Sequence, residues 1–101
     1  MSAMVDEAPA GFDWTRPWRL HPQVSLRPEP FGALLYHFGT RKLSFLKNRT
    51  LLTIVESLPG HESAESACRA AGVEHAQEDA YRRALGVLAD SKMIVIREDA
   101  R

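Results

Sequence analysis

The spacing of apolar residues changes once along this chain, near residue 47, from a period of two to a period of about 3.6. Before the change, the runs 24–27, 32–38 and 42–46 have the two-residue period of strands. Pro28 and Pro30 end the first run because proline cannot donate to a ladder, and a turn at 39–41 separates the other two. Three strands need cover on one face, and the three helix-spaced segments that follow can supply it.

Each predicted helix carries its own start or stop signals. Asn48 caps the first, which Pro59-Gly60 ends, and Ser63 caps the second, which Gly72 terminates. The third helix is expected over about 76–91, and the run 93–96 is a short extended tail that can pair with an existing strand. The predicted fold is α+β and winged helix-turn-helix-like, with a three-stranded antiparallel sheet followed by three helices (β-β-β-α-α-α) and a C-terminal strand as an option.

The length of 101 residues fits one domain, which we place at 14–97, between a flexible arm at 1–13 and a tail at 98–101. The formal net charge of zero argues against a generally basic nucleic-acid coat and a polybasic membrane binder. Cys68 is the single cysteine, so an internal disulfide is excluded. Without a secretory signal or an apolar run of about 20 residues, we expect a reduced, soluble, cytoplasmic protein with no membrane partner.

The neutral total conceals an uneven distribution of charge. Residues 13–50 hold seven basic and two acidic side chains, whereas both flanking segments are net acidic. A chain with this distribution can steer an acidic partner to the face that carries the predicted strands. The alternative is uneven scatter over a solvated surface, and the sequence does not decide between the two.

No arrangement of residues points to catalysis or to a metal. Cys68 lies on an alanine-rich helical stripe, where a packed and unreactive thiol is expected. The four histidines are not at ligand spacing, so surface or strand-edge imidazoles are expected. Glu78 and Asp79 are adjacent, so they point about 100° apart on a helix and form no working dyad. We therefore predict no enzyme, no catalytic residue, no metal and no cofactor.

Two binding functions remain open from the residues alone. The segment 63–96 has the layout of a winged helix-turn-helix, but Glu74, Glu78 and Asp79 at the start of its second helix would repel phosphates. The run Lys42–Leu46 would accept an added peptide strand if it lies at a sheet edge, and its basic flanks would favour an acidic peptide. Alternatively, those charges act only as gatekeepers against edge aggregation.

The stretch WRLHPQVSLRPEPFGALLYHFGTRKLSFLKNRTLL (18–52), with AESACRAAGV (64–73) and YRRALGVLADSKMI (81–94), resembles the peptide chaperones of mycofactocin biosynthesis. These are PqqD-like peptide-recognition domains, or RiPP recognition elements, and the likeness covers about residues 12–97. The resemblance implies three strands followed by three helices. It also implies a non-catalytic protein that binds the leader of a short precursor peptide and presents it to a radical SAM maturase.

In related domains the leader adds a strand to the third strand and lies against the third helix. Carried over by position, the resemblance implies the following peptide-binding residues: Lys42, Leu43, Ser44, Phe45, Leu46, Tyr81, Arg82 and Leu85. Helical phase leaves open which flank of the third helix lines the groove. The alternative functions are a winged-helix nucleic-acid-binding protein and a domain whose edge strand serves self-association.

Overall fold

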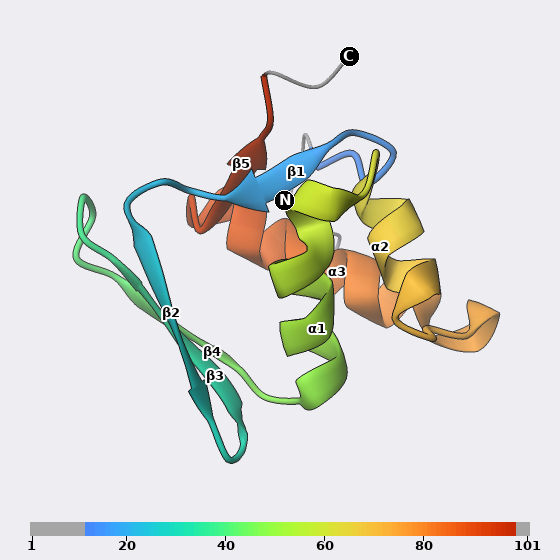
Figure 1. Cartoon of the computed structure of the whole chain (residues 1–101), viewed down its shortest axis with the longest axis horizontal. Coiled ribbons are helices and arrows are strands. Elements are labelled where there is room, and N and C mark those ends of the chain that lie inside the picture. The colour runs from blue at the N-terminus through green and yellow to red at the C-terminus, as the bar shows by residue number, and fades with distance from the viewer. Residues whose placement is uncertain (1–11, 99–101) are drawn as a thin grey trace, which may run out of the picture.

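The computed structural model describes residues 12–98, which form five strands, three α-helices and two 3-10 turns (Figure 1). The strands are β1 (Trp18–Leu20), β2 (Val24–Glu29), β3 (Gly32–His37), β4 (Leu43–Leu46) and β5 (Ile94–Ile96). The helices are α1 (Arg49–Ser57), α2 (Ala64–Ala70) and α3 (Glu78–Asp90), and the 3-10 turns are Leu58–Gly60 and His75–Gln77. The predicted α+β class, with three antiparallel strands followed by three helices, is confirmed.

The strands form two separate sheets. β2, β3 and β4 form an antiparallel sheet in that order, and β1 pairs with β5 in a second, two-stranded sheet. The sequence did not predict β1, which lies before the first run with clear alternation. The C-terminal strand was expected as an option, and its partner is this missed strand: Trp18 lies opposite Ile96, and Leu20 opposite Ile94. The small sheet therefore brings together the two ends of the described chain.

The helix signals read from the sequence act as expected. The Asn48 side chain accepts a hydrogen bond from the Leu51 N–H at 2.7 Å, and Ser63 accepts one from the Ser66 N–H at 3.0 Å. Gly72 has a φ of +91°, the left-handed conformation that ends α2. α3 begins at Glu78, two residues later than expected, because a 3-10 turn occupies 75–77.

One hydrophobic core lies between the three-stranded sheet and the helices. The inner face of β3 presents Ala33, Leu35 and His37, all buried, toward α1. In Figure 1, α1 and α3 lie on the same side of this sheet, and β4 forms one of its edges. Ile54 from α1 and Leu85 from α3 are fully buried in the same core. No helix of the described chain covers the opposite face of the sheet (Figure 1).

The described residues begin at Phe12, two positions before the domain start expected from the sequence. The Phe12 ring lies 4.9 Å from the Trp18 ring, and the indole N–H of Trp18 donates to the Asp13 carbonyl at 2.9 Å. The rest of the expected arm, residues 1–11, and residues 99–101 of the expected tail lie outside the described residues. Within 12–98, no helix is long and apolar enough to cross a bilayer.

Candidate functional site

β4 is an edge strand, and its register with β3 determines which of its amides face outward. The His37 N–H donates to the Lys42 carbonyl at 2.9 Å, so these two residues form a hydrogen-bonded pair. Such pairs alternate along an antiparallel ladder, so Ser44 and Leu46 also direct their backbone groups toward β3. The N–H and C=O groups of Leu43 and Phe45 therefore face the open edge.

The opposite edge of the sheet, along β2, is a poorer template for an added strand. The same alternation directs Val24, Leu26 and Pro28 outward, since the Phe38 N–H donates to the Gln23 carbonyl. Pro28 has no N–H, and the Val24 N–H already donates to the His21 carbonyl at 2.9 Å. Of the two edges, only β4 offers consecutive outward-facing donors.

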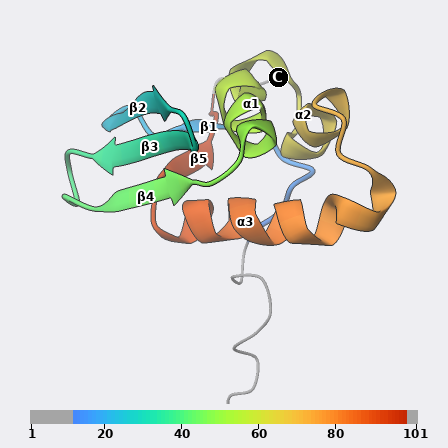
Figure 2. The same ribbon diagram turned by 90° about the horizontal axis from the view of Figure 1, so that it is seen from below.

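A hollow of about 200 Å³ lies next to the end of β4. It is bounded by Asn48 and Leu51, in the cap and first turn of α1, and by Ala80, Tyr81 and Ala84 of α3. Asn48 follows β4 after one residue, so the hollow lies just beyond the C-terminal end of β4. In Figure 2, α3 runs opposite to the direction of β4. Ala80 and Ala84 lie on the flank of α3 that borders this hollow.

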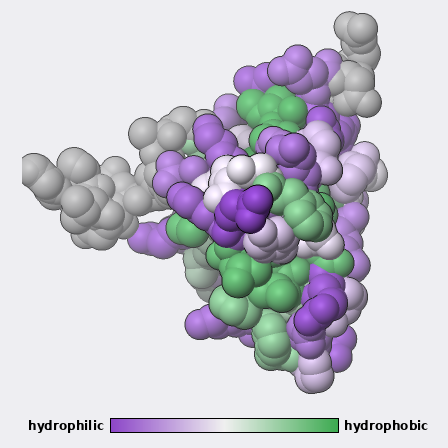
Figure 3. Space-filling view, turned by 90° about the vertical axis from the view of Figure 1, so that its left-hand side faces the viewer, coloured by the Kyte–Doolittle hydropathy of each residue, from purple (hydrophilic) through white to green (hydrophobic). Residues whose placement is uncertain are grey.

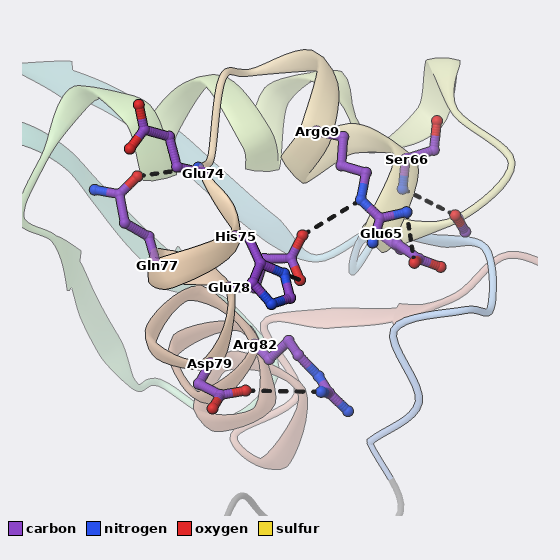
Figure 4. Close-up of polar contacts among 10 residues, drawn as sticks. Glu65, Ser66, Arg69, Glu74, His75, Gln77, Glu78, Asp79 and Arg82 are labelled. Atoms are coloured by element: carbon purple, nitrogen blue, oxygen red, sulfur yellow. Dashed lines mark hydrogen bonds and ion pairs between the residues drawn. The ribbon is translucent and has the colours of Figure 1, made fainter.

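The three α3 residues implied by the resemblance lie in three different environments. Tyr81 is half-buried and lines the hollow. The Arg82 guanidinium stacks over the Trp14 ring, 4.8 Å from its centroid, and lies 3.8 Å from the Asp79 carboxylate (Figure 4). Leu85 is fully buried, so it packs in the hydrophobic core. Of the three, Tyr81 alone lines the hollow.

The five residues implied around β4 also divide by direction. Leu43 and Phe45 are 55% exposed and project from the outer face of the sheet, away from α1. Leu46 is fully buried beneath β4, and Ser44 shares its inward direction but is half-buried. Lys42 is exposed just before the strand. The binding roles of all eight residues stay predictions, and this placement decides which of them can act through the backbone and which through side chains.

The ends of β4 carry exposed cations. Arg41 and Lys42 precede the strand, and Lys47 and Arg49 follow it. Among residues 12–98, none of these four lies within ion-pair distance of a carboxylate, whereas Arg27 on β2 pairs with its neighbour Glu29 at 2.8 Å. Their charge is therefore available to a partner.

No catalytic constellation is assembled among the described residues. Cys68 is fully buried, as expected, and burial raises the pKa of its thiol to about 11. No three His, Cys, Asp or Glu side chains between 12 and 98 come together as metal ligands. The expectation of surface or strand-edge imidazoles fails at His37, which is 2% exposed, stacks 4.4 Å from His21 and accepts the N–H groups of Gly39 and Thr40.

The start of α3 is acidic in the structure as in the sequence. Glu78 lies 3.4 Å from both Arg69 and His75, and Glu74 is exposed in a capping box with Gln77 (Figure 4). Glu78 thus holds α2 and α3 together. A helix that begins with these carboxylates would meet DNA phosphates with repulsion.

The sequence did not identify the small residues that line the hollow. Ala80 and Ala84 give no signal of their own, because alanine is common on any face of a helix. Their phase relative to the buried Leu85 and Leu88 places them on one of two equivalent flanks, and only the structure shows that this flank borders the hollow next to α1.

Comparison with known proteins identifies the family of the chain. The model of the peptide chaperone MftB family matches residues 17–95. Proteins named peptide chaperone MftB from Mycobacterium tuberculosis and Mycobacterium ulcerans are 63% and 64% identical over 87 residues, 86% of this chain and 80% of each relative. The Mycolicibacterium smegmatis protein of that name is 63% identical over 95 residues, 94% of this chain and 92% of its own. No solved structure matches the chain. The chain therefore belongs to the peptide chaperone MftB family, and it is a non-catalytic peptide chaperone.

Proposed function

We propose that this chaperone binds the leader of a short acidic precursor peptide as an antiparallel strand on β4 and presents the peptide to a radical SAM maturase. The observation that carries the proposal is the pair of outward-facing backbone groups at Leu43 and Phe45, beside the hollow between α1 and α3. The name of the relatives, peptide chaperone, supports a peptide as the ligand.

The register of β4 specifies what the leader should look like. Leader residues opposite Leu43 and Phe45 would exchange hydrogen bonds with them and point to the outer face of the sheet. The leader residue opposite Ser44 would point inward, toward the flank of α3 that carries Ala80 and Ala84. Acidic residues at either end would meet the cations that flank β4. The leader should therefore be a short apolar strand between acidic residues.

The expected affinity follows from the same geometry. Two residues that exchange hydrogen bonds give up to four bonds at about 0.5–1.5 kcal/mol each, and each well-buried leader side chain adds about 1.5–3 kcal/mol. Ordering a flexible leader and holding two molecules together offset much of this gain. A net value near −8 kcal/mol corresponds to a Kd of about 1 μM, which suits a carrier that must release its cargo.

An NMR titration with a synthetic leader peptide tests the proposal. We expect amide shifts to cluster at Leu43, Phe45 and the hollow, with smaller changes at the inward-facing Ser44. Shifts centred on α2 or β5 would place the peptide elsewhere and refute binding along β4. A leader with its Asp and Glu residues replaced by Asn and Gln is the control for the acidic requirement.

The nucleic-acid alternative is tested in the same buffer. Because the start of α3 is acidic, duplex DNA should bind weakly and without sequence preference. A salt-dependent, sequence-specific complex at nanomolar protein would favour a winged-helix DNA binder over the peptide chaperone mechanism proposed here.

A further inference from the structure

The outer face of the three-stranded sheet is apolar, and no helix or strand of residues 12–98 lies over it. Phe31, Phe38, Leu43 and Phe45 are 47%, 59%, 55% and 55% exposed. Figure 3 looks onto this side of the molecule and shows hydrophobic residues gathered over much of it. Val87, which is 54% exposed, is a large apolar residue of α3 and lies outside this sheet. Leu43 and Phe45 belong to β4, and Phe31 and Phe38 lie immediately before and after β3. We call these four residues the outer patch.

The outer patch is an organised surface rather than scattered exposure. The rings of Phe31 and Phe45 lie 6.1 Å apart, and with Lys47 they line a shallow hollow of about 440 Å³. Tyr36 and Phe38 meet edge to face at 4.9 Å. The register places Tyr36 directly opposite Leu43 and Leu34 opposite Phe45, so the outward-facing apolar side chains of β3 and β4 lie next to one another.

Its size indicates the kind of interface it can support. A phenylalanine side chain buries about 150–250 Å² when covered, so four half-exposed side chains offer roughly 400 Å². This is within the range of functional patches on monomers, and about half of one side of a standard protein–protein interface of about 800 Å². The patch can therefore form the apolar centre of a reversible interface, with a polar rim around it.

The rim charges argue for an acidic partner and against a second copy of this chain. Lys47 lines the shallow hollow with Phe31 and Phe45, and the exposed Arg41 and Lys42 come just before Leu43. None of these three cations has an acidic neighbour within ion-pair distance among residues 12–98. Two copies paired face to face or through β4 would bring these cations against one another. A partner with an apolar ridge between carboxylates would satisfy both the patch and its rim.

We propose that the outer patch docks the enzyme that modifies the peptide, through a surface on that enzyme with an apolar centre and an acidic surround. This inference rests on the proposed function, because the occupant is chosen by its position beside the bound peptide. Leader side chains opposite Leu43 and Phe45 would project onto the same face. Leader and patch then form one composite surface, so the enzyme binds the loaded chaperone more tightly than the empty one.

A pair of exposed apolar residues provides the test. Phe38→Ser alters the patch at a position away from the β4 edge, and Val87→Ser removes a comparably exposed apolar side chain from α3. The affinity of each variant for the purified radical SAM maturase is measured by calorimetry without leader, and the affinity for the synthetic leader is measured separately. Circular dichroism checks that both variants are folded.

We expect Phe38→Ser to weaken maturase binding at least ~10-fold, the effect of losing an interface anchor, and to leave leader affinity within about 2-fold. Val87→Ser should leave maturase binding unchanged. By linkage, saturating leader should raise the affinity of the unmodified chain for the maturase, and the maturase should raise leader affinity by the same factor.

Equal maturase affinity of Phe38→Ser and the unmodified chain would overturn the inference. So would a patch-dependent dimer in sedimentation, or patch-dependent binding to vesicles of anionic lipid, since either would assign the face to another occupant. Failure of the proposed function looks different, because the leader itself would then fail to bind β4 whatever the state of the patch.

Discussion

Proline substitutions in β4 separate the backbone groups that hold the fold from those offered to the leader. Phe45→Pro removes an outward-facing N–H, and Ser44→Pro removes an inward-facing one that bonds to β3. Phe45→Ala is the matched control, because it removes the same half-exposed ring but keeps the amide. The difference between Phe45→Pro and Phe45→Ala therefore reports the amide alone.

The magnitudes follow from the ladder. At position 44, the lost hydrogen bond costs about 0.5–1.5 kcal/mol and the unsatisfied carbonyl left on Leu35 about 1–3 kcal/mol. Together these are a large part of the 5–15 kcal/mol that stabilises a typical domain. At position 45, the fold loses no ladder bond. Leader binding loses one, about 0.5–1.5 kcal/mol, which is a factor of about 2–13 relative to Phe45→Ala, and the proline ring also obstructs the incoming strand.

The assay combines urea unfolding with calorimetric titration of the leader. We expect Ser44→Pro to lower the free energy of unfolding by a few kcal/mol, and Phe45→Pro to change it little relative to Phe45→Ala. Leader affinity should decrease from Phe45→Ala to Phe45→Pro. If the two bind the leader equally while both remain folded, the leader does not pair with β4 and the assignment of its open edge as the binding site is refuted.

Four further outcomes follow from particular contacts. Lys42→Glu should lower the affinity for an acidic leader by a few-fold at low salt. The difference should become smaller as the salt concentration is raised, because salt screens the charge. Gly32→Ala should cost about 1–3 kcal/mol in thermal unfolding, because φ is +151° and a Cβ would collide with a backbone carbonyl of β4, whereas Gly60→Ala, in open space, should be neutral. Cys68, with a pKa of about 11, should react with thiol reagents at neutral pH only when the protein unfolds. Burial lowers the pKa of His21 below its ordinary value of 6.5, so the unfolded chain binds a proton at this residue more readily than the folded protein does. The free energy of unfolding should therefore decrease as the pH falls below 6.5, and this decrease should be smaller in His21→Gln.

Most of the helical half was predictable because its signals are local. Asn48, Ser63 and Gly72 act within one turn of their own positions, and each was assigned the role it has in the structure. β1 was missed for the opposite reason. The three residues of β1, Trp18–Leu20, are too few to show a period, and their partner strand, β5, lies more than 70 positions away. A strand of that length is identified only by the partner that pairs with it.

Alternation of residues could not predict which β4 side chains face the core, and the physical reason also bears on function. Along β3 both alternating sets are apolar, Ala33 and Leu35 on one side and Leu34 and Tyr36 on the other, so alternation cannot tell the core from the surface. Sheets with two apolar faces normally lie between two layers. Here the described chain supplies one layer only. A sheet that is apolar on both faces is what a protein with an unoccupied binding face would have. The apolar outer face therefore favours a partner on the outer patch over chance exposure.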